Sequence, residues 1–187
     1  MDDRFGNARQ LRNMYAVAFV RATRHDFMQE DNAPLFLSHG NIHTLNTRQC
    51  LRELDQFVRF DMEGSRYTED ILRVFEDLWG RGYTNCGIVL QAYLHRTERD
   101  IDWAIELGCR VRLCKGAYAE PPTIAFAAKS DINASYVKLA RRLLDAGHYP
   151  GLATHDLRII REIETWQPEP ASFEFQMLYG VRPEVQE

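Results

Sequence analysis

The chain has 187 residues, which is enough for one domain with a full hydrophobic core. Hydrophobic residues make up 45% and charged residues 27%, as in ordinary soluble globular proteins, and the net charge of −4 argues against nucleic-acid binding. No apolar stretch approaches the ~20 residues of a membrane helix. We therefore expect a single domain over residues 1–187, located in the cytoplasm or peripherally at a membrane.

The first 56 residues give the weakest structural signals. Met1–Asp31 has a mixed pattern that favours helix, and its apolar run Met14–Val20 has no small-residue cleavage site typical of a signal peptide. Pro34–Ser38 indicates one more strand, and Thr47–Leu54 one more helix.

From residue 57 onward, strand and helix signals alternate. Short apolar runs predict strands that start near Val58, Ile88, Val111, Leu152 and Phe173. Amphipathic segments between them predict helices over Tyr67–Trp79, Arg99–Leu107, Asn133–Asp145 and Leu157–Trp166. This order is typical of consecutive right-handed βαβ units, and we count five to six βα units. The extra segment Glu120–Asp131 reads as a loop of the kind that covers a ligand.

Each predicted strand leads into a cluster of polar side chains. Because the carboxyl ends of parallel strands lie side by side, we expect these clusters to form one site. Their members are Asp61, Glu63, Gln91, Arg112, Lys115, Thr154, His155, Asp156, Glu174 and Gln176.

Arg112 carries the strongest of these signals, since we expect its strand to be buried on both faces. A buried charge needs a partner or a ligand, so Arg112 pairs with Asp61 or Glu63, or it faces an anionic or electron-rich ligand. Two other residues of these clusters also have a purely structural interpretation beside the ligand-binding one. Gln91 suits a heterocycle's polar edge or an interstrand bond, and Asp156 suits a helix cap.

Other common motifs are missing. The sequence contains no GxGxxG and no GxxxxGK[ST], so it supports neither a Rossmann cofactor site nor a P-loop. His39 and His43 lie four residues apart near Cys50, but without a third ligand we read them as surface residues and expect no metal. The four cysteines show no CxxC spacing and are expected to be reduced. They are Cys50, Cys86, Cys109 and Cys114.

Taken together, the strand-end segments resemble proline dehydrogenase, a flavin-dependent enzyme family with a (β/α)8 barrel. The resemblance covers roughly residues 56–182, in the family's order and at about its spacing. It rests on FVRFDMEGSRYT, GIVLQAYLHRTERDI, RVRLCKGAYAEPPTIAF, GHYPGLATHD and FEFQMLYGVR. It implies an α/β fold of TIM-barrel type, here incomplete.

The resemblance also implies roles for individual residues. Asp61 and Arg112 match catalytic positions, with the arginine beside the flavin's reactive nitrogen, and Tyr118 matches an aromatic near the substrate. The remaining matches are FAD-binding positions, namely Met62, Gln91, Lys115, Gly116, Ala117, Thr154 and His155.

The implied reaction oxidises L-proline to 1-pyrroline-5-carboxylate by hydride transfer to FAD, and a quinone then reoxidises the flavin. A peripheral membrane contact and self-association are further hypotheses, and no nucleic acid is expected. The chain also departs from the family. PLFLSHG lacks the early-strand lysine, and Pro183 stands where a second basic residue is usual.

These departures leave two alternatives beside the enzyme. One is a non-catalytic remnant or interaction protein with a partial flavin site, whose open sheet edges a partner completes. The other is an open-sheet enzyme with different chemistry that uses Asp61, Arg112 and His155.

Overall fold

The computed structural model describes residues 17–19, 36–37, 57–178 and 181. The chain divides into two compact units, Met1–Gly87 and Ile88–Glu187, which are described separately. His39, His43, Cys50 and the predicted helix Thr47–Leu54 lie outside the described residues.

The first unit contains three short strands. They are β1 (Val17–Phe19), β2 (Phe36–Leu37) and β3 (Val58–Phe60). β1 pairs in parallel with β3 and antiparallel with β2, so the strand predicted at Pro34–Ser38 exists but is not another parallel βα unit. The helix expected within Met1–Asp31 is wrong at residues 17–19, where a short apolar run forms a strand; such a run carries no periodicity that tells the two apart.

Helix α3 (Thr68–Gly80) covers β3 of the first unit, after a single 3-10 turn, η1 (Ser65–Tyr67). Phe75 is fully buried and meets Phe60 edge to face, with ring centroids 5.3 Å apart. It also stacks on Trp79 at 5.8 Å. This aromatic cluster, with Ile71 and Leu78, is the core predicted from the amphipathic pattern of the helix.

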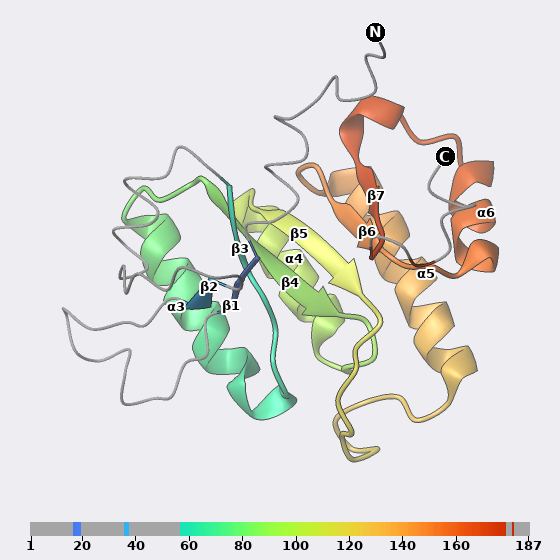
Figure 1. Ribbon diagram of the computed structural model, residues 1–187, viewed down its shortest axis with the longest axis horizontal. Coiled ribbons are helices and arrows are strands. Elements are labelled where there is room, and N and C mark those ends of the chain that lie inside the picture. The colour runs from blue at the N-terminus through green and yellow to red at the C-terminus, as the bar shows by residue number, and fades with distance from the viewer. Residues whose placement is uncertain (1–16, 20–35, 38–56, 179–180, 182–187) are drawn as a thin grey trace, which may run out of the picture. The chain divides into compact units, whose positions relative to one another are not determined.

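The second unit alternates strands and helices, as predicted. Its strands are β4 (Cys86–Gln91, whose first two residues belong to the first unit), β5 (Arg110–Cys114), β6 (Gly151–Ala153) and β7 (Glu174–Gln176). Its helices are α4 (Thr97–Leu107), α5 (Lys129–Ala146), α6 (Leu157–Thr165) and the 3-10 turn η2 (Pro170–Ser172). The strands lie in chain order, β4-β5-β6-β7, and β5, β6 and β7 are parallel (Figure 1).

The helices bury one face of these strands. α4 and α5 both pack on β5, and the Tyr136 hydroxyl of α5 donates to the Leu113 carbonyl at 3.4 Å. α4 ends at Gly108, whose φ of 74° lies in the left-handed region. Fully buried apolar side chains form the core of the unit, including Ile88, Leu90, Ile101, Leu113, Tyr136, Leu143, Leu152 and Ile163.

Strand β5 is not buried on both faces, which corrects the expectation for Arg112. Val111 and Leu113 are buried, whereas Arg110, Arg112 and Cys114 are only partly buried. The helices cover one face alone, so side chains alternate between the core and the opposite face. Arg112 therefore lies on the face without helices.

Two further observations concern the described residues as a whole. None of their helices is long and apolar enough to cross a membrane. Cys86 and Cys109 are buried and Cys114 is partly buried, and the structure joins none of these three described cysteines in a disulfide.

Candidate functional site

Arg112 is held by a polar chain that runs across three strands of the second unit. The register aligns Arg112 of β5 with Gly151 of β6 and Glu174 of β7. Gln176 lies two residues beyond Glu174 and so points to the same face. The Arg112 Nε donates to Gln176 Oε1, and Gln176 Nε2 donates to Glu174 Oε1. The partner that the structure gives Arg112 is thus a neutral amide.

Gly151 leaves the space through which this chain crosses β6. A Cβ at this position would lie 2.5 Å from Gln176 Nε2 and 2.7 Å from its Cδ, both closer than real Cβ contacts. The absence of a side chain on the central strand therefore lets a side chain from β7 reach β5.

Lys115 follows β5 and forms an ion pair with the residue that begins α6. Its Nζ lies 2.8 Å from Asp156 Oδ2, and both side chains are about three-quarters buried. Asp156 also caps α6, because its Oδ1 accepts from the Arg158 N–H at 3.1 Å. The hydrogen bond from Lys115 lowers the pKa of Asp156 despite its partial burial. The predicted cap is confirmed, and it also holds the lysine.

Gly116 allows the chain to turn tightly over an aromatic ring. Its φ is +108°, and a Cβ would lie 2.2 Å from Tyr93 Cδ1. Tyr93 is 5% exposed, and burial, followed by the charge of Glu120, raises its pKa. The backbone thus passes directly over the ring, while the following residues Ala117 and Tyr118 are exposed.

The Thr154-His155 pair lies at the carboxyl end of β6. Thr154 is buried, and its Oγ1 accepts from the Asp156 N–H at 3.1 Å. The Leu178 N–H donates to His155 Nε2 at 3.0 Å, so the opposite ring nitrogen carries the proton in the neutral tautomer. These bonds fix the loop after β6 against the end of β7.

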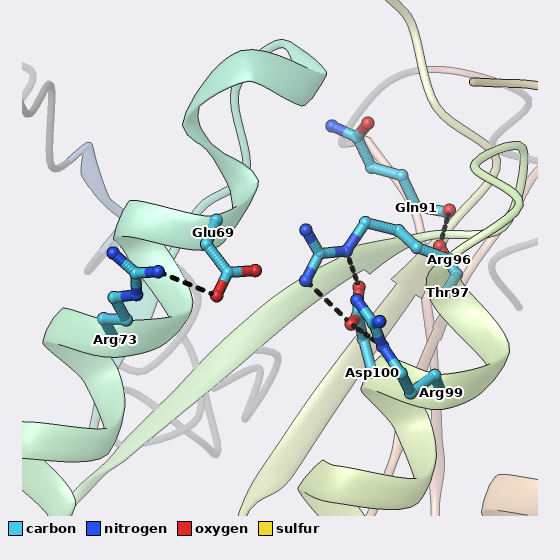
Figure 2. A network of polar contacts seen from close by, with 7 residues as sticks. All are labelled: Glu69, Arg73, Gln91, Arg96, Thr97, Arg99 and Asp100. Carbon is cyan, nitrogen blue, oxygen red and sulfur yellow. Dashed lines mark hydrogen bonds and ion pairs between the residues drawn. The ribbon is translucent and has the colours of Figure 1, made fainter. Parts of the chain in front are cut away.

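Gln91 ends β4 and is 3% exposed. Its backbone carbonyl accepts from Thr97 Oγ1 at 2.5 Å, which ties the strand end to the start of α4 (Figure 2). Arg96, the residue before α4, donates two hydrogen bonds of 2.6 and 3.0 Å to Asp100 of the helix. Asp100 is 3% exposed and Arg96 only partly buried, and their ion pair holds the start of α4, where Thr97 is bonded to the Gln91 carbonyl (Figure 2).

The predicted loop Glu120–Asp131 is anchored through its backbone to the segment after β4. The His95 N–H donates to Ile124 O at 2.9 Å, and the Phe126 N–H donates to Tyr93 O at 2.8 Å. Leu94 and Ala125 form a β-bridge between these bonds. α5 then begins at Lys129, four residues earlier than predicted, so the loop is shorter than expected.

Asp61 and Met62 follow β3 in the first unit. Asp61 is partly buried and its Oδ1 accepts from the Met62 N–H at 2.9 Å, while Met62 is 5% exposed. In the second unit, the structure links Arg112 to Gln176 and Lys115 to Asp156.

Glu174 and Gln176 were expected among the strand-end clusters but without a role of their own, and Gly151 was not predicted as part of the site. Gln176, Glu174 and Gly151 together hold Arg112. Period-two alternation in FEFQ, which places Glu174 and Gln176 on one face, was the available signal. Pairing across an intervening glycine could not be read from the sequence, because it depends on the register of β6 and β7.

Comparison with known proteins identifies relatives of this chain. The family model described as proline dehydrogenase matches residues 8–187. "Proline dehydrogenase 2" of Bacillus subtilis is 42% identical over 133 residues, 69% of this chain and 44% of that protein. "Proline dehydrogenase" of Deinococcus radiodurans is 38% identical over 140 residues, 72% of this chain and 45% of that protein. The chain therefore spans less than half the length of these relatives.

Solved structures agree with the sequence comparison. The crystal structure of proline utilization A from Bdellovibrio bacteriovorus, inactivated by N-propargylglycine, matches with a TM-score of 0.65 and 28% identity. The match covers 74% of this chain and 17% of that one. The α/β fold with parallel strands is consistent with an incomplete barrel of TIM type, and this confirms the predicted fold class. With a family model that matches nearly its whole length, the chain belongs to the proline dehydrogenase family.

Proposed function

We propose that this chain binds FAD and oxidises L-proline to 1-pyrroline-5-carboxylate, with a quinone as the electron acceptor. Family membership supports the reaction class. The single observation that carries the proposal is the polar chain that holds Arg112 on the face of β5 free of helices. A guanidinium oriented in this way suits a ligand on which negative charge develops.

The residues of the second unit fit a flavin dinucleotide. Gly116 gives the loop after β5 its tight turn over the Tyr93 ring, and this turn would shape the backbone that the resemblance assigns to FAD binding. Lys115 would offer its ammonium to a phosphate in competition with its ion pair to Asp156, and Thr154 and His155 would offer polar atoms at the end of β6. Gln91 and Ala117 complete the proposed cofactor set in the second unit, and Met62 of the first unit stays a prediction from the resemblance.

When bound, FAD would supply the hydride acceptor for the reaction. Arg112 would supply the positive charge that stabilises the reduced, anionic flavin, and Gln176 would keep its guanidinium in place. Asp61 would act as the second catalytic group, and exposed Tyr118 would pack against proline. Within the second unit, the bond from Thr97 to the Gln91 carbonyl would hold the end of β4 in position.

FAD titration with visible absorbance tests the cofactor half of the proposal. We expect the purified protein to take up FAD, and Arg112→Gln to weaken uptake about tenfold, because it removes a charged contact. Arg110→Gln is the matched control, since Arg110 lies on the same face of β5 and its guanidinium stacks 4.9 Å from the Tyr149 ring. No uptake at high micromolar FAD would refute the cofactor assignment.

Bleaching of the bound flavin by L-proline under anaerobic conditions tests the reaction. We expect bleaching with L-proline and none with D-proline, and Tyr118→Ala to raise the proline concentration needed. FAD uptake without bleaching by L-proline would instead support the non-catalytic alternative.

A further inference from the structure

The side-chain amide of Gln176 has its orientation fixed from both ends. Its Nε2 donates to the Glu174 carboxylate, which can only accept, so its Oε1 must face Arg112. The acceptor presented to the arginine is therefore determined by a second residue of the same strand. Hydrogen-bond donation therefore runs in one direction, from the Arg112 guanidinium through the Gln176 amide to the Glu174 carboxylate.

The acceptor is also neutral. A carboxylate in contact with Arg112 would form an ion pair and offset the positive charge, whereas an amide oxygen holds the Nε–H without doing so. Glu174 contributes its negative charge one residue farther along the chain. The geometry thus holds the guanidinium and leaves its charge available.

We propose that Gln176 is the positioning residue for Arg112, and that Gly151 is required because it gives Gln176 its path across β6. The functional part of this inference rests on the proposed flavin chemistry. Gln176 acts through Arg112 and is not itself a catalytic residue.

The first test needs no flavin. The Arg112 Nε–H gives a signal in ¹H–¹⁵N NMR spectra, and the disappearance of this signal in Arg112→Lys assigns it. We expect Gln176→Met, which removes the amide at similar length, to shift this signal and speed its exchange with water about tenfold. Gln176→Glu should retain slow exchange, because it keeps an acceptor. An unchanged signal in Gln176→Met would overturn the proposal whether or not the protein binds FAD.

Gly151→Ala tests the path across β6 without removing any polar group. The added Cβ meets the flexible end of Gln176, so the side chain moves while the fold is kept. We expect the same loss of Arg112 Nε–H protection as in Gln176→Met. Gly80→Ala is the control, because nothing lies within 4 Å of its Cβ position. Retained protection in folded Gly151→Ala would show that Gln176 does not need this path.

The second test measures the midpoint potential of bound FAD. We expect Gln176→Met and Gln176→Glu both to make the potential more negative, the first because Arg112 is no longer held and the second because its charge is offset. A Gln176→Glu potential equal to that of the unchanged protein would refute the need for a neutral acceptor. Failure of the unchanged protein to bind FAD would refute the proposed function instead, and the NMR result would stand.

Discussion

Replacing Gly116 by alanine gives a direct measure of how tightly the loop after β5 is packed. The substitution introduces two separate costs. An alanine at φ +108° is strained by about 1–2 kcal/mol. Its Cβ would also lie 2.2–2.7 Å from three atoms of the Tyr93 ring, which is 5% exposed and cannot turn away into solvent. Overpacking of this kind costs about 1–3 kcal/mol. We expect the free energy of unfolding to fall by about 2–5 kcal/mol.

Urea unfolding followed by circular dichroism measures this loss, and two variants separate its parts. Gly108→Ala has a positive φ of 74° with no atom within 4 Å of its Cβ, so it reports strain alone, about 1–2 kcal/mol. In a Tyr93→Ala background, Gly116→Ala should cost only as much as Gly108→Ala, because the ring is gone. A Gly116→Ala cost that is no larger than that of Gly108→Ala, or that is unchanged without the ring, would refute the packing of the loop on Tyr93.

Three further predictions concern charges and thiols. Asp100→Asn should lower the free energy of unfolding in urea by about 3 kcal/mol, because it leaves the partly buried Arg96 without its charged partner. Asp145→Asn, in an exposed ion pair, is the control and should change stability by less than about 0.5 kcal/mol. The Lys115 hydrogen bond lowers the pKa of Asp156, so this carboxylate contributes stability above its unfolded pKa that is lost as the pH falls through the lowered value. Asp156→Asn should therefore flatten the acid limb of the stability profile, and an unchanged acid limb would contradict this. Burial raises the pKa of Cys109 to about 12, so its thiol should react slowly. With iodoacetamide at pH 8, peptide mass spectra should show Cys114 labelled well before Cys109. Equal labelling rates would contradict the burial of Cys109.

The sequence predicted the regular elements of residues 57–176 well, because their helices are strongly amphipathic and separate short apolar strands. α3 and α6 begin within one residue of their expected starts. α5 begins four residues earlier than expected, at Lys129, because its first three residues are polar and exposed and give no apolar signal. The strand at Val17–Phe19 was missed for the opposite reason, since a short apolar run fits helix and strand alike.

The candidate site was predictable in its members more than in its contacts. Lys115, Thr154 and His155 were identified from their places at strand ends, and their roles stay predictions. The partner of Arg112 was not foreseen. An ion pair with a carboxylate was the expected structural alternative, whereas the observed partner is the amide of Gln176. That pairing depends on three strands in register and on a glycine in the middle one, which local patterns do not encode.

The loop before α5 has a practical consequence for labelling. Its attachment to the segment after β4 uses main-chain atoms, including the Pro122 carbonyl that lies 2.9 Å from His95 Nε2, and the Phe126 ring, which meets the His95 ring edge to face. Residues 121–124, in contrast, have exposed side chains. A cysteine at Thr123 could therefore carry a fluorophore without loosening the loop. The loop would then report ligand binding optically, at a point fixed to the scaffold by its backbone.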